Sequence, residues 1–553
     1  MARTPLMAAW QRQFKDMTQA RALGMSINEF KEKQAQELQL KVIQQSAGVN
    51  RREFMAGLLA LSATAALPKM ARASEVPRIA VVGAGLAGLT CALTLKDAGV
   101  PCTLYEASAR VGGRMFSNAT SYWKNQQVSE WCGELIDSDH VTVQKLAKRF
   151  GLKLDDLLTA QPKKSQDSNF FKNNYYSSAQ ADKDFAAIYD VIMAEMAAVG
   201  DNTLYNDINA AGRRLDAMSI ADWISAKVPG GLDSMLGGLL REAYVPEYGA
   251  DLEDQSALNL LWFLSDQPAE KHFAIFGSSD ERFHIRGGNE LLPRAIAAHI
   301  GGESSIRFAS TLLKLQQKSD QRYQLTFDNH GKTREEYADI VVLALPFSVL
   351  KNLDYKNAGF DVLKQRAIQE LGCGINSKLQ LQFETRVWNG EGAWIGQGNG
   401  SSYADTGYQS SWEVTRGQAG TTGILNLYSG GSVAKAMKTR KAFATAELPL
   451  AKSDAVRGLS QIENVFPGLT TQWNGLATQS LPHQSRYFGA SYAYYRVGQY
   501  AAFSGYEGAR QGQVYFCGDH TSVDYQGYME GAASEGAACA KQILSKLGRK
   551  VHG

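Results

Sequence analysis

The chain has 553 residues, a length typical of two or more domains or of one large two-part architecture. Hydrophobic residues make up 44% and charged residues 20%, which is the composition of a soluble globular protein and excludes disorder of the whole chain. The formal net charge of +3 is too small for a broad electrostatic footprint, so no nucleic acid is expected as a partner. Cysteine and histidine show no metal-ligand or disulfide spacing, and no metal site is predicted.

An export signal is predicted near the N-terminus. Arg51 and Arg52 precede the apolar run 56–67, and residues 71–73 (Ala-Arg-Ala) supply the small-x-small pattern of a cleavage site. The run is shorter than the about 20 residues that a membrane-spanning helix needs, so no permanent membrane span is expected. The pattern resembles a twin-arginine signal and favours a periplasmic or secreted protein; retention of residues 1–75 as an N-terminal arm would instead favour the cytoplasm.

Residues 78–95 follow the order of strand, glycine-rich loop and helix. In such a loop Gly83 permits a tight turn, Gly85 lets the backbone approach a pyrophosphate and Gly88 lets the helix pack closely on the strand. Glu106 stands at the end of the next predicted strand, where it can accept hydrogen bonds from a ribose. The pattern therefore predicts a dinucleotide-binding domain of the Rossmann type.

Several further motifs resemble those of the flavin-containing amine oxidase family, which includes monoamine oxidases, polyamine oxidases and L-amino acid oxidases. They are Arg110-Val-Gly-Gly-Arg shortly after the acidic residue Glu106, the segments 130–136 and 283–293, and, most specific, the segments 514–520 and 527–532 near the C-terminus. The resemblance extends from about residue 76 to about residue 548 and is greatest to bacterial L-amino acid oxidases.

The resemblance implies a mixed α/β fold in which a Rossmann-like FAD-binding domain is interleaved with a substrate-binding domain. The FAD-binding domain is expected to comprise 76–140, 280–372 and 484–548, and the substrate-binding domain 141–279, which is largely helical, and 373–483. The residues implied to contact FAD are Gly83, Gly85, Ala87, Gly88, Glu106, Arg110, Gly112, Gly113, Arg114, Gly133, Glu134, Leu135, Leu312, Gly518, Asp519, Gly527, Tyr528 and Met529.

FAD is expected to be bound without a covalent bond. Ser491 stands where some monoamine oxidases have the cysteine that bonds to the flavin. Lys378, on a segment with strand-like alternation, matches the single lysine that the family places near the flavin. Tyr492 and Tyr528 match two facing tyrosines that orient the substrate amine in monoamine oxidases. These three residues, Lys378, Tyr492 and Tyr528, are the predicted catalytic residues.

The substrate class is less directly indicated. L-amino acid oxidases bind the substrate carboxylate with an arginine, which can make two charge-assisted bonds, but the loop 133–136 carries none. Arg416 and Arg241 remain as candidates for this contact. The expected activity is oxidative deamination of L-amino acids, with release of ammonia and hydrogen peroxide. There are two alternatives to this activity. The protein is a monoamine or polyamine oxidase, or it is an amine dehydrogenase that does not use oxygen.

The expected partners are a small amine or amino acid and oxygen, and a homodimer is left open. Local patterns predict helices over 143–150, 185–198 and 258–264 and a buried strand within 338–346. Residues 161–180 are dense in Lys, Asn, Ser and Gln and predict a solvated loop.

Overall fold

The structure is a computed structural model that describes residues 77–549, apart from residues 202 and 440. The chain divides into two units, Met1–Val76 and Pro77–Gly553. The predicted export signal and arm therefore lie outside the described residues. No helix in the described part of the chain is both long enough and apolar enough to cross a membrane.

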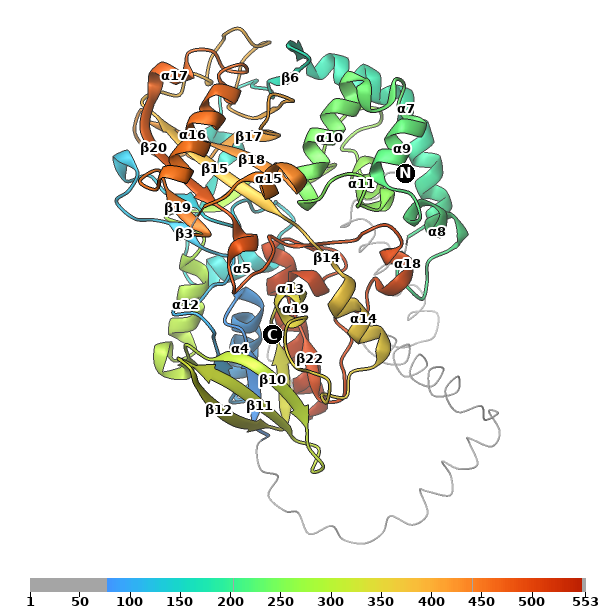
Figure 1. The fold of residues 1–553 in the computed structure, drawn as a ribbon, viewed down its shortest axis with the longest axis vertical. Helices are drawn as coiled ribbons and strands as arrows, with labels where there is room; N and C mark the ends of the chain where they lie inside the picture. Colours follow the sequence, from blue (N-terminus) through green and yellow to red (C-terminus); the bar gives the residue numbers. More distant parts are fainter. Residues whose placement is uncertain (1–76, 202, 440, 550–553) are drawn as a thin grey trace. The chain divides into compact units, whose positions relative to one another are not determined.

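A five-stranded parallel sheet with the strand order β22-β13-β1-β2-β9 forms the first core (Figure 1). Alternate side chains of β1 point to opposite faces, so Ile79 and Val81 pack against helices while Ala80 and Val82 pack against a second, three-stranded sheet. Both faces are covered, which explains why β1 and β13 consist of apolar residues throughout. The strands are β1 (Ile79–Val82), β2 (Thr103–Tyr105), β9 (Ile306–Arg307), β13 (Ile340–Leu343) and β22 (Val514–Phe516).

Helices α4, α12 and α19 cover one face of this sheet, and strands β10 to β12 cover the other (Figure 1). Helices α4 and α19 approach closely because Gly536 has no side chain: a Cβ there would lie 2.2 Å from the carbonyl oxygen of Ala87. The elements are α4 (Leu86–Asp97), α12 (Leu291–His299), α19 (Met529–Lys546), β10 (Thr311–Gln317), β11 (Tyr323–Asn329) and β12 (Lys332–Ala338).

A helical region follows between residues 141 and 265, in agreement with the predicted helices. Most of its longer helices begin at a serine or asparagine whose side chain accepts a hydrogen bond from the first turn, and this satisfies an otherwise unpaired amide. The apolar faces of the helices between residues 178 and 265 form one core around Trp223 and Leu240. The helices are α5 (Val141–Arg149), α6 (Leu157–Ala160), α7 (Ser178–Val199), α8 (Ala210–Asp216), α9 (Ile220–Lys227), α10 (Met235–Tyr248) and α11 (Ala257–Ser265).

A six-stranded antiparallel sheet with the order β16-β17-β18-β15-β20-β19 completes the second half. Strand β15 alternates as predicted: Leu379, Leu381 and Phe383 pack into an apolar core with helix α16, and Lys378 and Gln380 point to the opposite face. The elements are β15 (Asn376–Phe383), β16 (Ser402–Tyr403), β17 (Ser410–Glu413), β18 (Gly423–Gly430), β19 (Phe443–Thr445), β20 (Trp473–Ser480), α15 (Gly431–Ala436), α16 (Pro449–Ile462) and α17 (Leu469–Gln472).

Small elements connect these layers. Two-stranded sheets pair β3 with β4, β5 with β8 and β14 with β21. The remaining elements are β3 (Ser117–Asn118), β4 (Ser129–Glu130), β5 (Leu154–Asp156), β8 (Phe283–Ile285), β14 (Gly372–Cys373), β21 (Ala493–Tyr494), α13 (Phe347–Leu350), α14 (Val362–Glu370) and α18 (Gln499–Phe503). The strands of the parallel sheet come from all three stretches expected to bind FAD, and the exact domain boundaries stay a prediction.

The prediction of a solvated loop over 161–180 is wrong. The segment contains a hairpin of β6 (Asn169–Phe171) and β7 (Asn174–Tyr176), joined by Lys172 and Asn173 with positive φ. Phe170 and Phe171 are buried against the six-stranded sheet and helix α10. These apolar contacts determine the structure of the segment, whereas its average composition reflects the exposed residues around them.

Candidate active site

A cavity of about 930 Å³ opens where the strands of the parallel sheet end at their carboxyl side. Gly83 and Gly85 after β1, Glu106 after β2, Ala344 after β13 and Gly518 after β22 all line it. The carboxyl edge of a parallel sheet is where ligands bind in open α/β folds. The cavity then continues to the six-stranded sheet, from which Lys378, Trp412 and Tyr428 line it.

The glycine-rich loop has the geometry that the sequence predicts. Gly83 has a φ of +105°, and a Cβ there would lie 2.5 Å from the carbonyl oxygen of Ala344. A Cβ on Gly88 would lie 1.9 Å from the carbonyl oxygen of Gly83, so this glycine allows the helix to pack and does not line the cavity. A Cβ on Gly85 would meet no protein atom within 4 Å, which leaves that space open to a ligand.

The side chain of Glu106 holds this loop in place. Its Oε2 accepts a hydrogen bond from the amide of Ala84 at 2.8 Å, and its Oε1 accepts from the amide and the hydroxyl of Ser108. Arg110 holds the next loop, because its Nη2 donates to the carbonyl oxygen of Gly113 at 2.6 Å and its guanidinium lies 3.7 Å from the centre of the Phe116 ring. The two loops form one continuous wall of the cavity.

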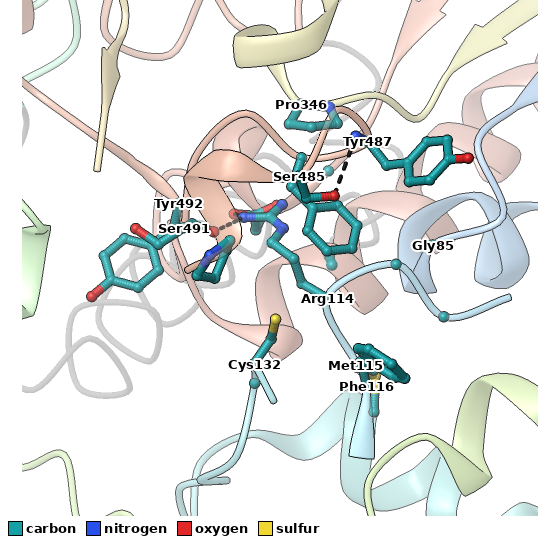
Figure 2. A pocket seen from close by; sticks show the side chains of 18 of the residues that line it. Gly85, Arg114, Met115, Phe116, Cys132, Pro346, Ser485, Tyr487, Ser491 and Tyr492 are labelled. Atoms are coloured by element: carbon teal, nitrogen blue, oxygen red, sulfur yellow. Dashed lines mark hydrogen bonds and ion pairs between the residues drawn. The ribbon is translucent and has the colours of Figure 1, made fainter. Parts of the chain in front are cut away.

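The side chain of Arg114 extends from this wall to the segment 514–520 near the C-terminus. It forms an ion pair with Asp519, and its Nη1 donates to the carbonyl oxygen of Ser491 at 2.6 Å. Figure 2 shows the guanidinium beside Ser491, with Tyr492 next to it. Segments far apart in the sequence therefore meet at one arginine.

The donor set of the cavity fits a dinucleotide with a pyrophosphate. Helices α4 and α19 both begin at the cavity, at Gly85 and Tyr528, without a side-chain cap on their first amides. Uncapped helix N-termini attract negative charge, and Arg114 adds a cation nearby. The open space at Gly85 provides the close backbone approach that a pyrophosphate requires.

Lys378 and Glu134 form a buried ion pair at the far end of the cavity. Nζ of Lys378 lies 2.5 Å from Oε2 of Glu134, and the two side chains are 9% and 5% exposed. The other carboxylate oxygen of Glu134 accepts a hydrogen bond from Nε1 of Trp412 at 2.9 Å. The sequence predicted only that Glu134 contacts FAD. The structure shows in addition that Glu134 neutralises the charge of Lys378.

Tyr492 and Tyr528 both line the cavity, and a third tyrosine joins them. The hydroxyl of Tyr492 donates to the carbonyl oxygen of Pro246 at 2.8 Å and lies 2.8 Å from the hydroxyl of Tyr428. Because Tyr492 uses its proton for Pro246, Tyr428 is the donor to Tyr492. The free lone pairs of the Tyr428 oxygen can therefore accept a hydrogen bond from a substrate amine.

Two glutamates that sequence reasoning missed also line the cavity. Glu247 lies near the end of α10, and Glu281 lies in the turn before β8. Burial and the charge of Asp137 raise the pKa of the Glu247 carboxyl to about 7. Burial, followed by the charges of Asp137, Glu247 and Glu134, raises the pKa of Glu281 to about 8. No local motif marks either residue, because tertiary packing alone brings them to the cavity.

The predicted substrate arginines do not reach the cavity surface. Arg241 is 40% exposed and pairs with Glu242 on the same helix. Arg416 donates through Nη2 to Ser401 and to the carbonyl oxygen of Asn399. Its buried Nε–H has no partner among the described residues. The predicted residues that do line the cavity are Gly83, Gly85, Ala87, Glu106, Arg110, Gly112, Gly113, Arg114, Gly133, Glu134, Leu135, Leu312, Lys378, Tyr492, Gly518, Asp519, Gly527, Tyr528 and Met529.

This combination of a glycine-rich βα loop, an acidic residue after the second strand and a second uncapped helix around one cavity defines a dinucleotide-binding oxidoreductase fold. The chain belongs to the family of flavin containing amine oxidoreductases, whose family model matches residues 86–544. FAD is therefore its cofactor, and Ser491 at the cavity wall has no thiol for a covalent bond to it.

Known proteins of this kind match most of the chain. An L-amino-acid oxidase from Mus musculus is 24% identical over 487 residues, which are 86% of this chain and 72% of the mouse protein. Cyclohexylamine oxidase from Brevibacterium oxydans superposes with a TM-score of 0.71 at 18% identity and covers 86% of this chain and 100% of its own. Putrescine oxidase with bound putrescine superposes with a TM-score of 0.70 at 16% identity, over 85% of this chain and 99% of its own.

Proposed function

We propose that the chain is an FAD-dependent oxidase of L-amino acids. In the balanced reaction an L-amino acid, oxygen and water give a 2-oxo acid, ammonium and hydrogen peroxide. When bound, FAD accepts a hydride from the carbon that carries the amino group and returns the electrons to oxygen. The observation that carries the oxidase proposal is the buried pair of Lys378 with Glu134, which fixes the ammonium group of Lys378 at the cavity wall.

The charge of Lys378 suits a reaction with oxygen. Oxygen becomes an anion as it takes up electrons, and a fixed cation in a site of low dielectric stabilises such an anion more than water does. Glu134 keeps the lysine in place without filling the cavity, because its second oxygen is held by Trp412. We infer that Tyr492, Tyr528 and Tyr428 enclose the reacting amino group and exclude water from it.

The amino acid class is supported by the mouse relative, which is named an L-amino-acid oxidase. Arg416 supplies a physical argument as well. Its Nε–H is buried without a partner, and an unpaired buried donor is costly. The charges of Glu281 and Glu134, which line the cavity, act on the Arg416 guanidinium. We infer that Arg416 leaves its contacts with Ser401 and Asn399 to give a substrate carboxylate the bidentate contact that an amino acid needs.

A second candidate is an oxidase of amines that lack a carboxylate. Between residues 141 and 279 and between 373 and 483, no described residue that lines the cavity is an arginine. Lys378 is the cation that these segments contribute to the cavity wall, and it is already paired. An amine oxidase needs no further cation, so this observation favours amines.

Peroxide release against a matched substrate panel distinguishes these candidates. The panel contains L-amino acids, their D-enantiomers and the amines that result from decarboxylation. Peroxide from L-amino acids but not from the amines supports the proposal, and the reverse result supports the second candidate. Bleaching of the flavin under nitrogen without peroxide in air would indicate a dehydrogenase and contradict both.

We also propose that the chain is exported by a twin-arginine route, on the basis of Arg51 and Arg52 before an apolar run. Cell fractionation of the full chain tests this. The native sequence is expected in the periplasm or medium, and replacement of both arginines by lysine is expected to retain the protein in the cytoplasm. Equal distribution of the two forms would contradict export by this route.

A further inference from the structure

Glu247 and Glu281 stand out because neither carboxylate is in a direct ion pair with a described cation, although the charge of Arg416 acts on Glu281 from a longer distance. No lysine, arginine or histidine of the described part of the chain forms an ion pair with either carboxylate. Glu247 receives a long hydrogen bond of 3.4 Å from the hydroxyl of Tyr528, and the carboxylate of Glu281 receives none from a described residue. Glu134, in contrast, is neutralised by Lys378.

Both carboxylates face the cavity. The side chain of Glu281 lies inside the protein, and the cavity that it lines gives water access to it. Glu247 is half-buried for the same reason. The ring of Tyr248, next to Glu247, also lines the cavity. The charge of Glu247 acts on both Glu281 and Tyr248, so the three side chains lie in one region of the cavity.

The backbone holds Glu281 rigidly. The residue has a φ of +45°, an unfavourable value for a side chain other than glycine. Its amide donates to Oδ1 of Asp137 at 2.9 Å, and Oδ2 of Asp137 accepts from the hydroxyl of Ser279. Strained backbone that is held by its surroundings occurs at ligand-binding positions. Asp137 thus holds the backbone of Glu281 at the edge of the cavity.

Helix α10 holds Glu247 in a similar way. The carbonyl oxygen of the preceding residue, Pro246, accepts hydrogen bonds from Tyr492 and from Nδ2 of Asn376. Gly249, in a left-handed conformation, ends the helix directly after Tyr248. Glu247 is therefore anchored to the same tyrosine that lines the reaction end of the cavity.

We propose that Glu247 and Glu281 bind a second positive charge on the substrate, an ammonium or guanidinium group other than the reacting amino group. The proposal rests on the proposed function and names its substrate class: L-amino acids with a cationic side chain, such as arginine and lysine. A cation between two carboxylates gains strong attraction in this enclosed site, and the face of Tyr248 adds a cation–π contact. A neutral side chain would leave both carboxylates without water and without a partner.

The same cation occurs in amino acids and in diamines, so the experiment includes both. Peroxide formation is measured with L-arginine and L-lysine, with the neutral analogues L-citrulline and L-norleucine, and with agmatine and cadaverine. The variants are Glu247→Gln and Glu281→Gln, and Glu253→Gln on the exposed surface is the control. Substrate binding is measured independently, from the change of the flavin spectrum as each compound is titrated under nitrogen, and thermal unfolding verifies that each variant is folded.

The proposal predicts that kcat/KM for the cationic substrates exceeds that for the neutral analogues at least tenfold, and that each cavity variant reduces this ratio at least tenfold through KM. Equal selectivity in the wild type and in both variants would overturn it. Activity with agmatine and cadaverine but not with amino acids supports the cation site and overturns the amino acid class. Peroxide from neutral L-amino acids alone overturns the cation site and leaves the oxidase function standing.

Discussion

Nζ of Lys378 lies 2.5 Å from Oε2 of Glu134, although Lys378 belongs to strand β15 and Glu134 to the loop after β4. The pair is buried, so neither charge is well solvated without the other. The position of the lysine at the cavity wall therefore depends on the glutamate.

The variant Glu134→Gln is expected to destabilise the protein by about 3–5 kcal/mol, because it leaves the ammonium of Lys378 buried without a counter-charge. Urea denaturation of the cofactor-free protein measures this loss. The double variant Glu134→Gln with Lys378→Met removes both charges and is expected to recover most of the stability. A double variant as unstable as the sum of the two single variants would contradict the coupling.

The variant Lys378→Met is expected to slow the reaction of the reduced enzyme with oxygen on the order of 10²-fold, because it removes the cation that stabilises the developing anion. Reduction by substrate under nitrogen is expected to change less. Stopped-flow measurement of the two half-reactions separates these effects. If both slow equally, Lys378 acts on the shape of the cavity and not on oxygen.

Two glycines of the same loop are expected to behave differently. In Gly88→Ala the new Cβ would lie 1.9 Å from the carbonyl oxygen of Gly83, and the forced shift is expected to cost about 1–3 kcal/mol of stability. In Gly85→Ala the new Cβ meets no protein atom within 4 Å and φ is −70°, so the cofactor-free protein is expected to keep its stability.

The same Gly85→Ala change is expected to weaken FAD binding strongly, because the methyl group occupies the space for the pyrophosphate. Denaturation of the cofactor-free proteins and flavin titration of each variant measure the two effects separately. Normal FAD affinity in Gly85→Ala would place the phosphates elsewhere in the cavity.

The selectivity for a cationic substrate is expected to depend on pH. Glu247 and Glu281 have raised carboxyl pKa values, about 7 and about 8, so they are largely protonated and neutral at pH 6 and become charged as the pH rises. The ratio of kcat/KM for L-arginine to that for L-citrulline is therefore expected to increase from pH 6 to pH 9. The guanidinium stays charged over this range, and the α-amino group titrates alike in both substrates.

The variant Glu281→Gln provides the check on this pH effect. It removes the group with the higher pKa, so the increase is expected to be smaller and to lie at lower pH. The charges that act on Glu281 include Asp137, Glu134 and Arg416, and all three remain in this variant. An unchanged profile would assign the pH dependence to another group.

The sequence by itself determined the features that depend on local pattern. The loop from Gly83 to Gly88, with a strand before it and a helix after it, predicted the dinucleotide site, because a tight turn and a close helix need glycine at these positions. The alternation around Lys378 predicted a strand with the lysine on one face. Family motifs added most of the predicted residues that line the cavity.

Only the tertiary structure decided what closes the substrate end. Glu247, Glu281 and Tyr428 come from a helix, a turn and a strand, and no spacing in the sequence connects them. Their proximity arises from packing between elements that are not neighbours in the sequence, as does the pairing of Lys378 with Glu134. Local propensity contains no information on such contacts, since the free energy that forms them comes from burial of side chains distant in the sequence.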